Sequence, residues 1–139
     1  MTDQAWFNAF GADLNIAANV PTVVASNGVG NQIRGDAIAA GEQTVRGSFG
    51  FGADINIGVN VPTVVAGNGV GNVIGGDVAA IGDQQVGDYA FHAASPFGDI
   101  NIGVNVPTVV AGNGVGNGIG GDVSALGNQE IGDLGFLPF

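Results

Sequence analysis

The chain contains no cysteine, no lysine and only two arginines among its 139 residues. Without cysteine it has no disulfide, no thiolate metal site and no cysteine nucleophile. The two arginines stand against twelve Asp and Glu residues, which gives a formal net charge of −10. Nucleic acids and anionic membranes are bound through clustered Lys and Arg. We therefore expect neither of them as a partner.

Other common features are also missing. The chain contains no run of about 18 apolar residues, which would predict a transmembrane helix. The N-terminus, MTDQAWFNAF, lacks the basic start and apolar run of a secretory signal. Charged residues make up only 10% of the chain and hydrophobic residues 45%, which argues against intrinsic disorder. The 27 glycines follow no three-residue period, so the chain is not collagen-like.

What the chain does contain is an internal repeat. The stretch DINIGVNVPTVVAGNGVGN occupies residues 54–72 and recurs unchanged at 99–117, and a looser version, DLNIAANVPTVVASNGVGN, occupies 13–31. Repetition of this kind decides the architecture before any local motif does. The expected units are an N-terminal aromatic plug (1–10), repeat 1 (11–50), repeat 2 (51–95, with a linker at 89–95) and repeat 3 (96–139, with a C-terminal aromatic cap).

Each repeat is predicted to form short β-strands. Along residues 54–61, Ile and Val alternate with Asp, Asn and Gly, and this period of two predicts a strand with one buried side. Pro62 marks a bend or a strand edge, and GNGVGN at 67–72 predicts a corner, because Gly and Asn accept positive φ. Residues 73–88 contain four glycines, which favours strands and glycine corners over the alternative of a helix at 78–86.

Near-identical repeats suit a stack in which every rung meets the same environment. The sequence predicts an all-β fold, a three-repeat β-solenoid or cross-β stack, with each repeat forming one large rung or two smaller ones. Apolar columns such as Ile16/Ile57/Ile102 and Val20/Val61/Val106 are expected to fill a dry interior. Asn side chains stacked about 4.8 Å apart can each donate to one neighbour and accept from the other. The predicted Asn columns are Asn15/Asn56/Asn101, Asn19/Asn60/Asn105, Asn27/Asn68/Asn113 and Asn31/Asn72/Asn117.

The DINI or DLNI strand, the GVGN corner and the later glutamines (Gln43, Gln84 and Gln129) resemble curlin-type functional-amyloid repeats. Those repeats pair short strands through a G-x-G-N turn and place Asn and Gln in stacked columns. The resemblance covers each repeat and therefore most of the chain. It implies an extracellular β-solenoid fibre subunit.

Carboxylates also recur in register. Stacked like charges repel unless they are protonated or bridged by a cation, and Ca²⁺ accepts several carboxylate and carbonyl oxygens in flexible geometry. Two interpretations, solvated acidic columns and calcium sites, both remain open at this point. The candidate metal ligands are Asp13, Asp54, Asp99, Asp36, Asp77 and Asp122.

A further group of residues is expected at contacts between subunits. Arg34 and Arg46 occur only in repeat 1, where repeat 2 has Gly75 and Gly87. They can pair with acids of their own repeat or meet the acidic third repeat of the next subunit. The terminal aromatic residues Trp6, Phe7 and Phe139 are the other candidates.

The expected function follows from the repeat itself. The open ends of a stack invite further copies, and PTVVA is an uncharged segment of high β propensity. We expect a structural protein, of the functional-amyloid kind, that assembles into an extracellular or cell-surface filament or layer by end-to-end stacking. Its partners are copies of itself, and it has no cofactor unless it binds calcium. No catalytic motif accompanies the single histidine, His92, so we expect no enzyme. The alternative is a calcium-binding or ligand-presenting β-roll module.

Overall fold

The computed structural model describes residues 14–47, 54–87, 89–90, 99–132 and 134–135. These residues form β-strands and turns and contain no helix. The predicted all-β class is therefore confirmed. The alternative helix at 78–86 is wrong, because Val78–Gly87 is a strand. The N-terminal plug, most of the linker and the C-terminal aromatic residues lie outside the described residues.

Each repeat forms one rung of five strands. Rung 1 consists of β1 (Leu14–Asn19), β2 (Thr22–Ala25), β3 (Gly28–Val29), β4 (Gln32–Ile33) and β5 (Ala37–Arg46). Rung 2 consists of β6 (Ile55–Asn60), β7 (Thr63–Ala66), β8 (Gly69–Val70), β9 (Val73–Ile74) and β10 (Val78–Gly87). Rung 3 consists of β12 (Ile100–Asn105), β13 (Thr108–Ala111), β14 (Gly114–Val115), β15 (Gly118–Ile119) and β16 (Val123–Ile131). Two short strands, β11 (Tyr89–Ala90) and β17 (Leu134–Gly135), follow rungs 2 and 3 and pair with each other.

The rungs stack in parallel and in register, with rung 2 in the middle. β6 lies between β1 and β12, and β10 lies between β5 and β16. Equivalent residues face one another, so that Asn56 pairs with Asn15 on one side and with Asn101 on the other. Three-stranded parallel sheets form in this way along the whole rung. The molecule is a short β-solenoid.

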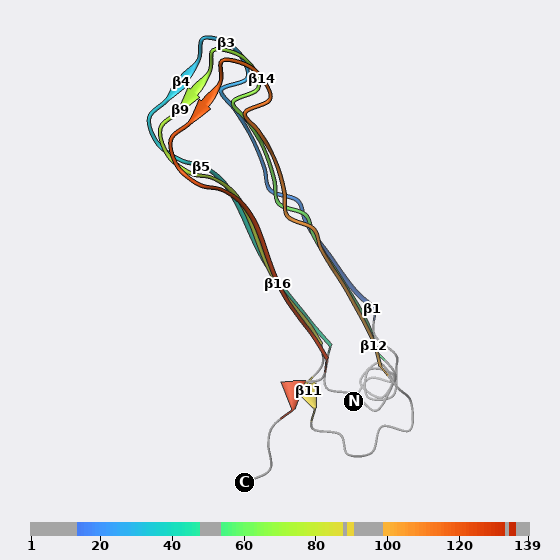
Figure 1. The fold of residues 1–139 in the computed structure, drawn as a ribbon. Helices are drawn as coiled ribbons and strands as arrows, with labels where there is room; N and C mark the ends of the chain where they lie inside the picture. Colours follow the sequence, from blue (N-terminus) through green and yellow to red (C-terminus); the bar gives the residue numbers. More distant parts are fainter. Residues whose placement is uncertain (1–13, 48–53, 88, 91–98, 133, 136–139) are drawn as a thin grey trace, which may run out of the picture.

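A rung has two long arms joined by a tip (Figure 1). The first two strands form the outgoing arm, the next two short strands form the tip, and the ten-residue strand β5 or its equivalent forms the returning arm. Glycines with positive φ make the tip: Gly69 and Gly71 have φ angles of 118° and 67°, and their counterparts in the other rungs agree within 1°. This corner occurs once per repeat, which is why each repeat forms one large rung.

The interior of the outgoing arm is not the one expected. Burial alternates without a break through 54–66, and the buried side carries Asn56, Gly58 and Asn60 rather than Ile and Val. The prediction that the Ile and Val columns fill the interior is wrong: Ile16 is 65% exposed and Val20 is 57% exposed.

The physical reason is the close approach of the two arms. A Cβ on Gly58 would lie 2.6 Å from Nε2 of Gln84 and 2.8 Å from Val86 of the returning arm. Nearer the tip, the interior is apolar, and Val64, Ile74 and Val78 are fully buried there. Burial of side chains of this size contributes roughly 1.5–3 kcal/mol each.

Candidate functional site

Within the described part of the chain, the two ends of the stack expose the edges of its sheets. The backbone N–H of Val61 donates to the carbonyl of Asn19 in rung 1, and the N–H of Val106 donates to the carbonyl of Asn60 in rung 2. These N–H groups point toward the preceding rung. In rung 1, the equivalent Val20 N–H points to the open end, where the described residues supply no further strand. An unpaired edge of this kind is a template for another chain.

The column Asn15/Asn56/Asn101 is a side-chain ladder. Nδ2 of Asn15 donates to Oδ1 of Asn56, and Nδ2 of Asn56 donates to Oδ1 of Asn101, both at 2.9 Å. Asn56 is fully buried, so its side-chain amide depends on these neighbours. The ladder has an amide acceptor facing the rung 1 end and an amide donor facing the rung 3 end.

A second ladder runs along the returning arm in the opposite direction. Nε2 of Gln129 donates to Oε1 of Gln84, and Nε2 of Gln84 donates to Oε1 of Gln43, both at 2.6 Å. Gln84 is 1% exposed. This ladder therefore has a donor facing the rung 1 end and an acceptor facing the rung 3 end. In both ladders the two ends of the molecule are complementary.

At the tip, the column Asn31/Asn72/Asn117 combines amide-to-amide contacts with bonds to the backbone. Nδ2 of Asn31 donates to Oδ1 of Asn72 at 3.1 Å, and Nδ2 of Asn72 donates to Oδ1 of Asn117 at 3.2 Å. The backbone N–H of Asn72 donates to the same Oδ1 of Asn117 at 2.9 Å. Asn72 is fully buried. The two shortest bonds of its Nδ2 go to the carbonyls of Asn68 at 2.9 Å and of Gly28 in rung 1 at 3.0 Å, so backbone groups also hold this column.

The column Asn27/Asn68/Asn113 differs from the prediction. Oδ1 of Asn27 accepts the backbone N–H of Asn68, and Oδ1 of Asn68 accepts that of Asn113, both at 2.9 Å. Nδ2 of Asn27 and Nδ2 of Asn68 donate to the carbonyls of Val65 and Val110 in the next rung. The predicted amide-to-amide ladder is therefore wrong for this column, because backbone groups of the adjacent turn take the place of the neighbouring amide. Asn113 is exposed in rung 3, where the described residues supply no following turn for its side chain.

The fourth Asn column links the two arms. Nδ2 of Asn60 donates to the carbonyl of Gly41 in rung 1 (2.9 Å) and to that of Asp83 in its own rung (3.1 Å). Nδ2 of Asn105 makes the same pair of bonds one rung later. The predicted side-chain ladder is wrong here too, because carbonyls of the facing arm accept both hydrogens of each amide.

Asn19, the rung 1 member of this column, makes one of these two bonds within the described residues. Its Nδ2 donates to the carbonyl of Glu42 in its own rung at 3.1 Å. The acceptor that would match Gly41 belongs to a rung preceding rung 1. The rung 1 end therefore presents a donor that a preceding rung could use.

The aspartates also act between rungs. Oδ1 of Asp36 accepts the backbone N–H of Asp77, and Oδ1 of Asp77 accepts that of Asp122, both at 2.9 Å. Likewise, Oδ1 of Asp99 accepts the N–H of Asp54 at 2.9 Å. Among the described residues, no three His, Cys, Asp or Glu side chains are grouped closely enough to hold a metal ion.

Arg46 lies on the outer surface of the returning arm. Its Nη2 donates to Oε1 of Gln85 in rung 2 at 3.0 Å, and Nε2 of Gln85 donates to Oε2 of Glu130 in rung 3 at 2.9 Å. The side chains thus form a polar track across the three rungs. The candidates Asp13, Trp6, Phe7 and Phe139 lie outside the described residues, and no described contact assigns a role to Arg34.

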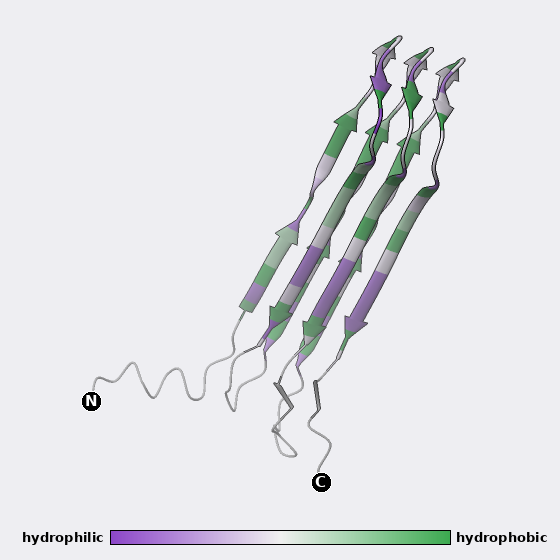
Figure 2. Ribbon diagram, turned by 90° about the vertical axis from the view of Figure 1, so that its left-hand side faces the viewer, coloured by the Kyte–Doolittle hydropathy of each residue, from purple (hydrophilic) through white to green (hydrophobic). Residues whose placement is uncertain are grey.

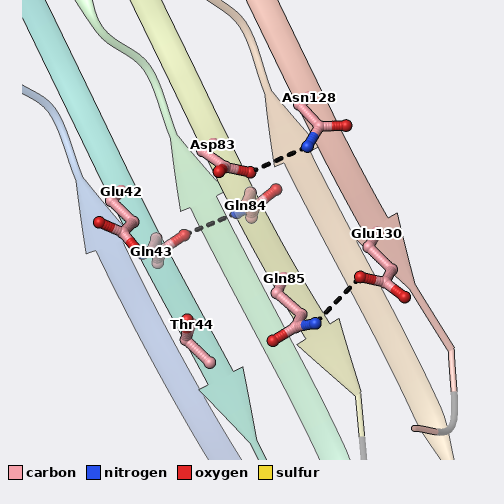
Figure 3. A pocket seen from close by; sticks show the side chains of 8 residues that line it. All are labelled: Glu42, Gln43, Thr44, Asp83, Gln84, Gln85, Asn128 and Glu130. Atoms are coloured by element: carbon pink, nitrogen blue, oxygen red, sulfur yellow. Dashed lines mark hydrogen bonds between the residues drawn. The ribbon is translucent and has the colours of Figure 1, made fainter.

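A shallow polar pocket of about 210 Å³ lies on the same arm (Figure 3). Asp83 accepts a hydrogen bond from Nδ2 of Asn128 at its rim, at 3.2 Å. Each returning strand correspondingly carries a hydrophilic segment (Figure 2). The pocket is lined by Glu42, Gln43, Thr44, Asp83, Gln84, Gln85, Asn128 and Glu130. Its carboxylates make this outer surface acidic.

In the column Gly35/Gly76/Gly121, the room for a side chain depends on the rung. A Cβ on Gly76 would collide with Oδ1 of Asp36 and lie 2.7 Å from the backbone of Gly35 in rung 1. A Cβ on Gly121 would collide in the same way with rung 2. A Cβ on Gly35 meets nothing within 4 Å, because no described rung precedes it. The described residues do not require glycine at position 35, whereas a further rung placed before rung 1 would.

The outer surface of the outgoing arm is apolar apart from one Thr in each rung. We define the apolar face by the outward side chains of this arm in all three rungs. None of them is charged. Several are well exposed, including Ile102 at 45% and Val24 at 68%. In rung 2 they are Ile55, Ile57, Val59, Val61, Thr63 and Val65.

Some residues of this site were not among those predicted from the sequence. The glutamines of the returning arm were expected in a stacked column only through the resemblance, and the Gly35 column was not predicted, although exact recurrence in all three repeats could have indicated both. The exposure of the apolar face depends on the tertiary structure. No protein-family model, no curated protein and no solved structure matches this chain.

Proposed function

We propose that the protein is a structural subunit that polymerises end to end, with rung 3 of one copy stacked on rung 1 of the next. The observation that carries this proposal is the complementarity of the two ends. At such a junction, Asn101 of one copy meets Asn15 of the next as a donor meeting an acceptor. Gln43 of the second copy likewise finds an acceptor in Gln129 of the first. Each net hydrogen bond contributes about 0.5–1.5 kcal/mol.

The column Asn19/Asn60/Asn105, which links the two arms, supports the same arrangement. Gly127 is the rung 3 equivalent of Gly41, whose carbonyl accepts from Asn60 inside the molecule. In a stack, the carbonyl of Gly127 takes the corresponding place beside Asn19. The junction then repeats the contact that already joins rung 1 to rung 2. Its geometry is the same because the repeats are nearly identical in sequence.

Charge opposes this assembly but does not prevent it. Each copy carries a formal charge of −10, and three rungs occupy about 14 Å along the stack. The Debye length in physiological salt is about 8 Å, so the repulsion between successive copies is partly screened. At the aligned carboxylate position Glu42/Asp83/Asn128, rung 3 has a neutral Asn. Stacking therefore places Asn128 rather than a third acid next to Glu42.

The proposed setting is the cell surface or the extracellular space, as a filament or surface layer, with no catalytic role and no required cofactor. Support for this setting comes from the curlin-like features of the repeat. The alternative of a calcium-binding or ligand-presenting module gains no specific support from the described Asp columns, which accept backbone N–H groups.

Negative-stain microscopy of purified protein over a concentration series tests the proposal. Two series are needed, one with calcium and one with a chelator. Concentration-dependent fibres in both series are expected. Monomers at every concentration in both series would overturn the filament and leave a discrete module. Assembly that requires calcium would instead favour the metal-binding alternative.

A further inference from the structure

The apolar face has a regular relief. Because the rungs are in register, equivalent side chains line up along the stack axis, as in the row Ile16, Ile57 and Ile102. Successive rows are two residues apart along the strand, which is about 6.6 Å. The face therefore consists of parallel apolar ridges with grooves between them. In a polymer, each ridge continues from copy to copy.

We propose that this face binds the same face of a second copy, so that two stacks pair laterally into one filament with a dry interior. The inference rests on the end-to-end polymer proposed above. Ridges of one face fit the grooves of an identical face, because both sets run along the same axis with the same spacing. Two sheets pack in this way at about 10 Å, with interdigitated side chains.

The distribution of charge favours a second copy as the occupant. The outward side chains of the returning arm include Glu42, Asp83 and Glu130, whereas those of the outgoing arm include no charged residue. Pairing through the outgoing arms therefore places those carboxylates on the outside of the pair. A net charge of −10 per copy is thus compatible with contact between these two faces.

The size of the face determines the order of assembly. Eleven residues per rung and three rungs span about 36 by 14 Å, or about 500 Å² per copy. A stable interface needs about 800 Å² from each partner. One copy alone falls short of this area, whereas two stacked copies provide about 1,000 Å². Lateral pairing is therefore expected to follow end-to-end stacking and not to occur between monomers.

A matched pair of substitutions tests this order and this surface. Ile102→Lys places a charge on the apolar face, and Leu126→Lys places the same charge on the outer surface of the returning arm of the same rung. The two residues are 45% and 57% exposed, so both variants are expected to fold. The readout is mass per length measured by scanning transmission electron microscopy.

Unmodified protein and Leu126→Lys are expected to give two subunits per axial repeat of about 14 Å, and Ile102→Lys one. One subunit per repeat in the unmodified protein would overturn the pairing and leave the stacking proposal intact. That result would mean that another surface or another segment of the chain covers the face. Complete absence of filaments would instead overturn the stacking proposal and the pairing with it.

Cross-linking provides a readout that does not depend on filament morphology. The chain has no cysteine, so Val59→Cys introduces a single thiol on the apolar face, and Thr44→Cys places one on the returning arm as a control. A bis-maleimide shorter than the axial repeat of about 14 Å cannot join successive copies in one stack. Covalent dimers are expected from Val59→Cys filaments and not from Thr44→Cys filaments. Equal yields from the two variants would overturn the inference.

Discussion

Nε2 of Gln84 donates to Oε1 of Gln43 at 2.6 Å, in a position where a Cβ on Gly58 of the facing arm would lie 2.6 Å from the same nitrogen. The hydrogen bond between the two glutamines therefore depends on the absence of a side chain at Gly58. A glycine on one arm provides the space for an amide ladder on the other. The amide is nearly fully buried, so its partners must come from adjacent rungs.

Replacement of this amide should destabilise the fold. Gln84→Leu is expected to lower the free energy of unfolding by about 1–3 kcal/mol, because it leaves the buried amide of Gln43 and the exposed amide of Gln129 without their partner. Denaturant unfolding at concentrations below assembly measures the change. Gln85→Leu, on the outward side of the same strand, serves as the control and should cost less. Equal stability of the two variants would contradict the role of the ladder.

Two substitutions in one glycine column should separate folding from assembly. Gly76→Ala is expected to destabilise the monomer, because the new Cβ collides with rung 1. Gly35→Ala is expected to leave monomer stability within about 0.5 kcal/mol, because its Cβ meets nothing within 4 Å. It should nevertheless slow or abolish polymerisation, since rung 3 of a preceding copy would collide with it.

Thermal unfolding and a light-scattering time course measure these two effects. Gly118→Val is the control for assembly, because a Cβ at position 118 also meets nothing within 4 Å and the equivalent residue of rung 2 is Val73. Its polymerisation should match that of the unmodified protein. Normal polymerisation of Gly35→Ala would argue against a junction between rung 3 and rung 1.

Arg46 is expected to promote assembly through charge. It reaches Gln85 in rung 2, and at a junction the residue equivalent to Gln85 in the preceding rung is Glu130. Surface ion pairs contribute about 0.2–1 kcal/mol, so Arg46→Gly should raise the critical concentration by up to about fivefold. The fold tolerates glycine there, because rung 2 has Gly87 at the equivalent position. A critical concentration unchanged at low salt would count against this contact.

Salt should accelerate polymerisation of the unmodified protein. Ten net negative charges per copy repel one another, and raising the ionic strength from about 0.01 to 0.15 M shortens the Debye length from about 30 to 8 Å. The lag time in light scattering is expected to shorten over this range. A sample that contains urea at the same ionic strength serves as the control for unspecific aggregation. Slower assembly at higher salt would show that attraction between charges dominates the junction.

The alternation of Ile and Val with Asn and Gly correctly predicted strands, and the glycines of GNGVGN correctly predicted a corner. The ladders at Asn15 and Gln84 follow from recurrence in every repeat. Recurrence alone could not show that Asn60 and Asn113 lie in columns without an amide ladder, because their partners are backbone groups. The bond from Asn60 to Gly41 joins residues 19 positions apart in the chain, and no local pattern encodes which strand lies opposite.

The sequence by itself determined that three equivalent units stack in register, because near-identical repeats are satisfied by one repeated environment. It also determined that each strand has two different faces. Only the tertiary structure decided which face is inside, because a period of two is the same whichever side is buried. At Gly41 and Gly58 a Cβ would crowd side chains of the facing arm, although rung 1 has Ala17 at the position of Gly58. Hydrogen bonds between rungs satisfy the buried amides of Asn56 and Gln84. The bulky Leu, Ile and Val side chains of β1, β6 and β12 therefore lie on the outside, where they form part of the apolar face.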